Sequence, residues 1–166
     1  MDFAATPRAK ELTELVTTFV TEEIEPVVEQ YHQDVARGGD HTTWAESPIM
    51  ADLRTKARVQ GLWNLFLPVG HDQPYAQKYG THGGAGLTNL DYAPVAEAMG
   101  RATTLAPYVF NCNAPDTGNM EVLLKYGTDA QKQTWLEPLL DGRMRSMFGM
   151  TEPGVASSDA TNMAAT

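Results

Sequence analysis

Hydroxyl and carboxylate side chains gather near the end of the chain, directly after a short apolar run. The composition of residues 146–150 predicts a strand, and residues 152–154 (Glu-Pro-Gly) predict a tight turn. Residues 157–159 (Ser-Ser-Asp) follow. Turn N–H groups and hydroxyls could hydrogen-bond a planar heterocycle or a phosphate without any cationic side chain. On spacing alone, however, an ordinary turn that satisfies its own backbone is the better interpretation.

A resemblance changes that interpretation. Residues 148–159, Phe-Gly-Met-Thr-Glu-Pro-Gly-Val-Ala-Ser-Ser-Asp, resemble the flavin-contacting signature of the acyl-CoA dehydrogenase family, which opens the middle β-domain of those proteins. The finer likeness is to the branch related to the dehydrogenase half of certain long kinase-like fusion proteins. The resemblance covers nearly the whole chain in the family's order, through segments at 86–89, 110–119, 123–127, 131–132, 135–136 and 138–142.

The resemblance implies a mainly α fold. Residues 1–145 would form an all-helical amino-terminal bundle domain, and residues 146–166 would form the first strand and flavin-contact turn of an incomplete β-barrel domain. In the family, FAD is held between these domains and a carboxy-terminal helical bundle. A glutamate of that bundle removes the α-proton of the acyl thioester, so we expect no catalytic residue within this chain. Binding and orientation are what this segment would contribute, since the redox chemistry belongs to the cofactor.

The resemblance also implies roles for individual residues. Phe148 and Met150 would approach the flavin through backbone groups, and the Thr151 hydroxyl would hydrogen-bond the edge of the ring system. A donor there stabilises the negative charge that builds on the ring. Ser157 and Ser158 would meet the cofactor pyrophosphate, and Ser158 would also reach the acyl-CoA. One extra residue before the Ser-Asp pair, relative to the commonest family pattern, leaves open which serine makes the contact.

Three residues of a segment similar to the family's acyl-pocket helix are candidates for the substrate wall. They are Asp116, Thr117 and Met120. Helix capping and core packing explain the same residues equally well, so both interpretations stay open.

Composition limits the classes of partner. A chain of 166 residues with 42% hydrophobic residues suits one domain with one core. Its net charge of −9 argues against nucleic acid, because phosphate contacts need a concentrated basic surface. The expected partners, by resemblance, are an acyl-CoA substrate and electron-transfer flavoprotein or a similar acceptor, with a homo-oligomer for the full-length protein. The four histidines lack ligand-like spacing, so no metal site is expected.

Location follows from what the chain lacks. No stretch is apolar for the length of a membrane span, and residues 1–7 do not read as a secretory signal. Cys112 is the only cysteine and cannot form an internal disulfide, which favours a reducing compartment. We therefore expect a cytoplasmic protein, with organellar targeting left open. Acyl chain length, and the choice between a dehydrogenase and an oxidase of related fold, depend on residues outside this chain.

The elements that must position these residues are helical. Hydrophobic spacing and capping residues predict that the last helix follows a reciprocal capping box at residues 128–131, with Trp135, Leu136 and Leu139 as its buried face. Pro26 should bend the first helix. The helices are expected at residues 8–37, 47–61, 88–100, 113 or 116 to 127, and 128–142.

Two hypotheses of different class remain. The chain is the amino-terminal portion of a flavin-dependent acyl-CoA dehydrogenase of the fatty-acid β-oxidation type, inactive without the catalytic base. Alternatively, it is a free-standing, non-catalytic helical binding module derived from that family. A single strand is unstable without partners, and a module would not need the complete signature at 150–159. The signature therefore favours the first hypothesis.

Overall fold

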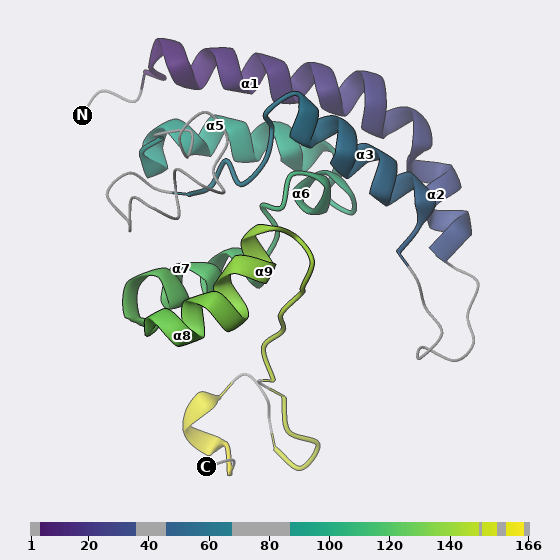
Figure 1. The fold of residues 1–166 in the computed structure, drawn as a ribbon. Helices are drawn as coiled ribbons and strands as arrows, with labels where there is room; N and C mark the ends of the chain where they lie inside the picture. The colour runs from purple at the N-terminus through teal and green to yellow at the C-terminus, as the bar shows by residue number, and fades with distance from the viewer. Residues whose placement is uncertain (1–3, 36–45, 68–86, 150, 156–158, 165–166) are drawn as a thin grey trace.

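The computed structural model describes residues 4–35, 46–67, 87–149, 151–155 and 159–164. All regular secondary structure within these residues is helical, which confirms the predicted mainly α fold (Figure 1). The helices form an upper and a lower group in Figure 1. The upper group contains α1 (Pro7–Phe19), α2 (Val28–Val35), α3 (Pro48–Val59), α5 (Asn89–Met99) and α6 (Ala106–Val109), and the lower group contains α7 (Asp116–Tyr126), α8 (Asp129–Gln131) and α9 (Glu137–Leu140).

Capping side chains begin the main helices of the upper group. The Thr6 hydroxyl accepts the Ala9 N–H at 3.2 Å, and Ser47 and Thr88 play the same part for α3 and α5. Pro26 interrupts the first helix as predicted, because it has no N–H to donate to the preceding turn. The path from α1 to α2 therefore passes through a π turn and a 3₁₀ turn, at Val20–Ile24 and Glu25–Val27.

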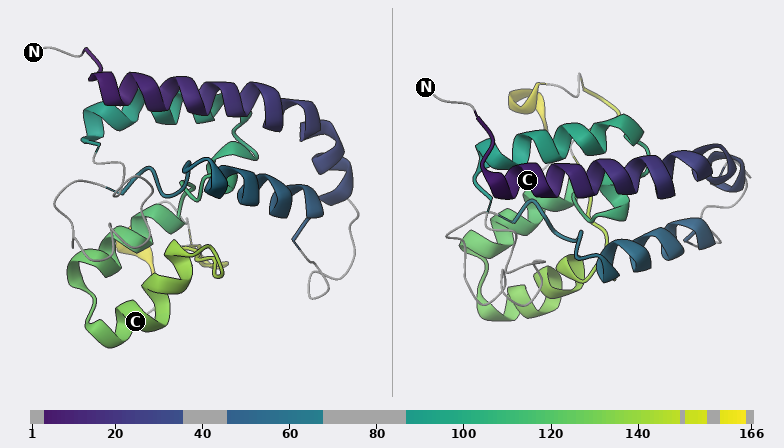
Figure 2. Two further views of the ribbon diagram at one scale, coloured as in Figure 1. Left: turned by 45° about the horizontal axis from the view of Figure 1, so that its top comes forward. Right: turned by 90° about the horizontal axis from the view of Figure 1, so that it is seen from above.

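The upper group packs around the larger of two cores. Seen from above, α1 runs between α5 and α3 (Figure 2, right). The rings of Phe19 and Phe110 meet edge to face at 5.3 Å between centroids, which joins α1 to the turn after α6. Other fully buried members of this core include Leu12, Val16, Ile24, Leu62, Leu65, Val95, Leu105 and Val109.

The lower group encloses a smaller core, and the predicted capping box begins its helix α8. The Thr128 hydroxyl accepts the Gln131 N–H while the Gln131 side chain accepts the Thr128 N–H, as predicted. Leu136 and Leu139 are buried, but Trp135 is 49% exposed, so its predicted burial is wrong. A π turn at Lys132–Leu136 explains the difference, because it rotates the chain relative to an α-helical face. Phe66, Leu67, Met120, Leu124 and Leu140 complete this core.

The two groups are joined by buried asparagines in the left-handed region of backbone space. Asn64 and Asn111 have φ of 54° and 53°. The Asn111 amide donates to the Asn64 side-chain oxygen at 2.7 Å and to the Leu139 carbonyl at 3.0 Å. The Asn64 amide donates to the Leu140 carbonyl at 2.8 Å. The Leu139 carbonyl also accepts the Gly142 N–H at 2.9 Å, whereas the Leu140 carbonyl, at the end of α9, is satisfied by side chains.

The turn after α9 is covered by Trp63 and two arginines. The guanidinium of Arg58 lies 3.8 Å from the Trp63 ring centroid and that of Arg54 lies 5.1 Å away. Arg54 also donates to the Gly142 carbonyl at 3.0 Å. Gly142 itself has a φ of +66°, and a Cβ there would lie 2.1 Å from an Arg54 nitrogen. The turn therefore requires glycine both for its backbone and for its neighbours.

The chain after this turn forms no strand in the described residues. Residues 144–149 have no regular secondary structure, so the strand predicted at 146–150 is absent as far as residue 149. Met150 lies outside the described residues. A strand is stable only when a neighbour accepts and donates its backbone hydrogen bonds, and no such neighbour lies in the described part of the chain.

Gly142→Ala should destabilise the chain by more than about 1 kcal/mol, because an alanine with positive φ is strained and its Cβ would displace Arg54 and Trp63. Gly118→Ala is the matched control: Gly118 lies within α7 with no atom within 4 Å of the added Cβ. It should be neutral or stabilising by up to about 1 kcal/mol. Urea unfolding of both variants measures the difference, and equal midpoints would contradict this role of Gly142.

Candidate functional site

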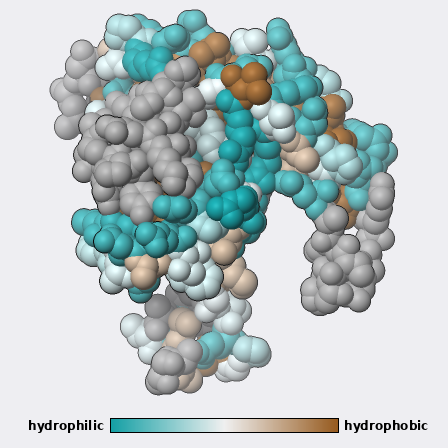
Figure 3. Space-filling view, in the orientation of Figure 1, coloured by the Kyte–Doolittle hydropathy of each residue, from teal (hydrophilic) through white to brown (hydrophobic). Residues whose placement is uncertain are grey.

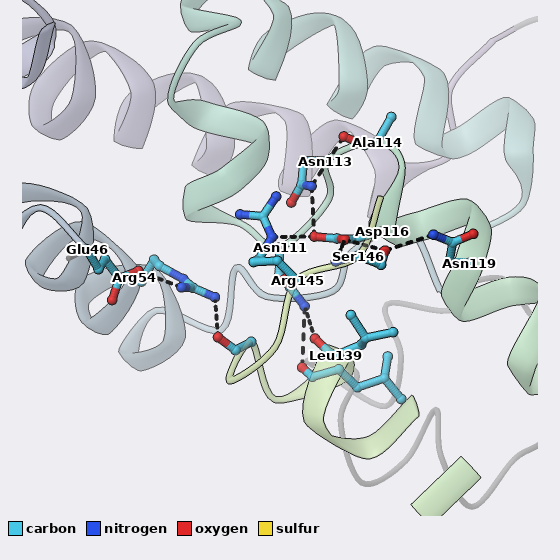
Figure 4. A network of polar contacts seen from close by, with 12 residues as sticks. Glu46, Arg54, Asn111, Asn113, Ala114, Asp116, Asn119, Leu139, Arg145 and Ser146 are labelled. Carbon is cyan, nitrogen blue, oxygen red and sulfur yellow. Dashed lines mark hydrogen bonds and ion pairs between the residues drawn. The ribbon is translucent and has the colours of Figure 1, made fainter. Parts of the chain in front are cut away.

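One buried carboxylate fixes the start of the terminal segment to α7. Asp116 is the first residue of α7, and its side chain is 2% exposed. It accepts the Ser146 N–H at 2.7 Å and the Ser146 hydroxyl at 2.6 Å (Figure 4). Arg145 Nε and the Asn113 amide donate to its other oxygen, and Asn119 donates to the Ser146 hydroxyl. We call these five residues the Asp116 network.

The network keeps Asp116 ionised. Burial acts to raise the pKa of Asp116, but hydrogen bonds from Ser146 and Asn113 and the charge of Arg145 outweigh it. The pKa of Asp116 therefore lies below its usual value. A carboxylate at the first position of a helix is also favoured by the helix dipole.

Beyond the network the terminal segment projects into solvent. Met147 is 78% exposed and Phe148 is 64% exposed, which is unusual for large apolar side chains. Thr151 is exposed as well. The turn predicted at 152–154 is present, with the Val155 N–H 3.4 Å from the Glu152 carbonyl oxygen. The Glu152 carboxylate accepts the Ala164 N–H at 2.9 Å and so folds the end of the described chain back on this turn.

The remaining predicted cofactor contacts are only partly described. Met150, Ser157 and Ser158 lie outside the described residues. Asp159, which closes the signature, accepts the Thr161 N–H at 3.0 Å and starts a 3₁₀ turn at Ala160–Asn162. Its carboxylate therefore caps its own backbone.

The three predicted substrate-wall residues lie on α7. Met120 is fully buried in the lower core, and Asp116 is engaged in its network. Thr117 is half-buried. The position of Met120 agrees with the alternative of core packing, whereas the Asp116 carboxylate forms no capping bond to α7 in the described chain. A role in lining a substrate pocket stays a prediction for all three.

Several residues that shape this region were missed by sequence reasoning. Arg145 and Ser146 meet Asp116 from about thirty positions along the chain. No local pattern encodes such a pairing. Trp63 and Asn64 lie in the apolar run 62–67, where an asparagine is a candidate for a left-handed residue because Asn is enriched at positive φ. That signal could have indicated the joint between the two groups.

Comparison with known proteins decides the family. Residues 6–143 match the family described as Acyl-CoA dehydrogenase, N-terminal domain. The chain belongs to this family. This acyl-CoA dehydrogenase N-terminal domain is 47% identical to mouse acyl-CoA dehydrogenase family member 10 over 96% of its length. It is 45% identical over its whole length to the Mycobacterium tuberculosis protein named probable acyl-CoA dehydrogenase FadE2.

A solved structure shows the same fold. A Mycobacterium abscessus protein assigned as an acyl-CoA dehydrogenase superposes with a TM-score of 0.78 at 51% identity, over 97% of this chain. The acyl-CoA dehydrogenase N-terminal domain spans only part of these relatives: 14% of the mouse protein, 37% of FadE2 and 38% of the solved chain.

The described residues show neither a metal-binding group of side chains nor a membrane-spanning helix. They contain no group of three or more His, Cys, Asp or Glu side chains placed to hold a metal ion. None of the described helices combines the length and the apolar character that crossing a membrane requires.

Asp116→Asn should lower the free energy of unfolding by about 2 kcal/mol at neutral pH, because an asparagine NH₂ would face the Arg145 and Asn113 donors. Since the folded pKa of Asp116 is lowered, its stabilisation is present above the unfolded pKa of about 3.9 and is lost as pH falls through the folded pKa. The variant should therefore lose stability less steeply than the parent below about pH 5.

Asp129→Asn, at an exposed helix start, is the control and should change stability little. Urea unfolding between pH 7 and pH 2 tests both variants. Parallel pH profiles for the parent and Asp116→Asn would show that the carboxylate does not hold the segment.

Proposed function

We propose that this domain is the amino-terminal portion of an FAD-dependent enzyme that introduces an α,β double bond into an acyl-CoA thioester, as in fatty-acid β-oxidation. The observation that carries the proposal is the terminal segment, which resembles the family's flavin signature and is held beside the start of α7 by the Asp116 network. The names of the relatives and the family match support it.

The described residues suit a flavin at this segment. No backbone N–H or C=O of residues 147–149 forms a hydrogen bond within the described chain. The Thr151 hydroxyl is exposed and also has no partner there. The flavin ring edge carries both donors and acceptors, so these groups could pair with it. Met147 and Phe148 beside these groups are large apolar side chains left exposed, as is common at binding surfaces.

The residues of the chain would bind and orient. When bound, FAD supplies the redox chemistry by accepting a hydride. Thr151 would donate to the ring edge, with backbone groups of Phe148 and Met150 beside it, and Ser157 or Ser158 would meet the pyrophosphate. Asp116 would act at a distance by holding the start of this segment beside α7. The acyl-CoA substrate, an electron-transfer flavoprotein or similar acceptor, and a homo-oligomer are part of the same proposal.

Thr151→Val in the native gene product should shift the flavin absorption maximum or reduce flavin retention on gel filtration, because valine removes the hydroxyl donor at nearly constant volume. Thr55→Val is the control, since the Thr55 hydroxyl is exposed and bonds only the Ala51 carbonyl of its own helix. An unchanged spectrum and unchanged flavin content in Thr151→Val would remove the proposed contact.

The 166-residue chain by itself should show no acyl-CoA-dependent dye reduction, because the proposed mechanism takes its base from a region outside these residues. A dye-coupled assay with added FAD and acyl-CoA of several chain lengths measures this. Turnover above the protein-free blank would require a base within the chain and would contradict the proposal. Because the base would lie outside these residues, we also expect the native gene product to be much heavier than this chain by intact mass.

A further inference from the structure

A hollow of about 430 Å³ lies between α2, α3, α6 and the turn after α9. This volume is within the range of small-molecule sites, about 300–1,000 Å³. Figure 3 shows the recess between α3 and that turn, edged by hydrophilic side chains. None of the predicted flavin or substrate residues lines it. Arg145, which is bonded to Asp116 at the start of the terminal segment, does line it, so the hollow adjoins that segment.

Several arginines line the hollow of this acidic protein. Three arginines, Arg54, Arg143 and Arg145, and one acid, Glu46, contribute to its lining, against a net charge of −9 for the chain. Arg54 is bonded to Glu46 at 2.6 Å, and the Nε of Arg143 is bonded to Asp141. Arg145 is likewise paired with Asp116, so each of the three arginines has a carboxylate partner. The terminal nitrogens of Arg143 and Arg145 form no hydrogen bond in the described chain and can therefore donate to an anion.

Three donors of the lining are left without partners. The hydroxyls of Tyr31 and Tyr108 form no hydrogen bond in the described chain, and Arg145 uses only its Nε, on Asp116. The Arg145 guanidinium lies 4.5 Å from the Tyr108 ring centroid, so the two groups are held together. Tyr31 lines the same hollow from α2, together with Tyr108 of α6 and Arg145.

These groups carry the N–H and O–H protons that an oxyanion accepts as hydrogen bonds. Burial and the neighbouring Tyr108 raise the pKa of Tyr31, so its phenol keeps its proton throughout the neutral range. The terminal nitrogens of an arginine bind phosphate or carboxylate oxygens in pairs. Val35 and Met50 supply apolar surface in the same hollow, against which the body of a ligand could pack.

We propose that this hollow binds a small organic anion, a phosphate monoester or a carboxylate. Its oxyanion group pairs with Arg145 and the hydroxyls of Tyr31 and Tyr108, and its apolar body contacts Val35 and Met50. The proposal is independent of the flavin contact, so either can fail without the other.

Calorimetric titration of the 166-residue chain with phenyl phosphate and with benzoate tests the proposal. Saturable binding of at least one is expected, weakened at least tenfold in the double variant Tyr31→Phe/Tyr108→Phe, because two charge-assisted hydrogen bonds are lost. Neither hydroxyl has a hydrogen-bond partner among the described residues and both rings are kept, so the fold should not change. Tyr126→Phe, a tyrosine 71% exposed on α7, is the control and should bind as the parent does.

The two ligands distinguish phosphate from carboxylate as the preferred group. Amide signals of Arg145 and Ser146 should shift during the titration, while that of Thr128, in the lower group, should not. A dissociation constant of about 10 mM is the weakest that this titration resolves. The proposal would be overturned if neither phenyl phosphate nor benzoate bound at that concentration. Equal affinity in the parent and the double variant would overturn it as well.

Discussion

A carboxylate that is 2% exposed is stable as an ion only while hydrogen-bond donors surround it, and this requirement organises the region around Asp116. Its donors come from the turn before α7 and from residues 145–146, far along the chain. Moving the terminal segment away would remove the three hydrogen bonds from Arg145 and Ser146 and leave only the one from Asn113, which is unfavourable for a carboxylate. The position of the segment is thus a consequence of solvating one charge.

A second set of polar contacts fixes the end of α9, and with it the start of the terminal segment, relative to the upper helices. Asn64 and Asn111 tie the end of α9 to the upper helices, and Gly142 lets the chain turn beneath Trp63. The terminal segment therefore leaves from a place that is fixed relative to both cores. A short stretch with few contacts of its own can be held accurately in this way, which is what presenting backbone groups to a planar cofactor requires.

The sequence predicted much of the fold because most of its signals are local. The capping box at Thr128, the start of α3 at Ser47 and the break at Pro26 each depend on residues within one turn of helix. Trp135 was misplaced because a π turn breaks the 3.6-residue period. The Asp116 network could not be predicted, since its members meet only in the folded chain. The strand predicted at 146–150 is absent over residues 146–149 because no partner strand lies in the described residues.

Amide hydrogen exchange of the 166-residue chain tests the central claim most directly. If the buried Asp116 carboxylate holds the segment, the Ser146 amide, which donates to it at 2.7 Å, should exchange much more slowly than its intrinsic rate. The amides of Met147, Phe148 and Gly149, which have no acceptor in the described chain, should exchange rapidly. Exchange of Ser146 as fast as that of its three successors would contradict the account.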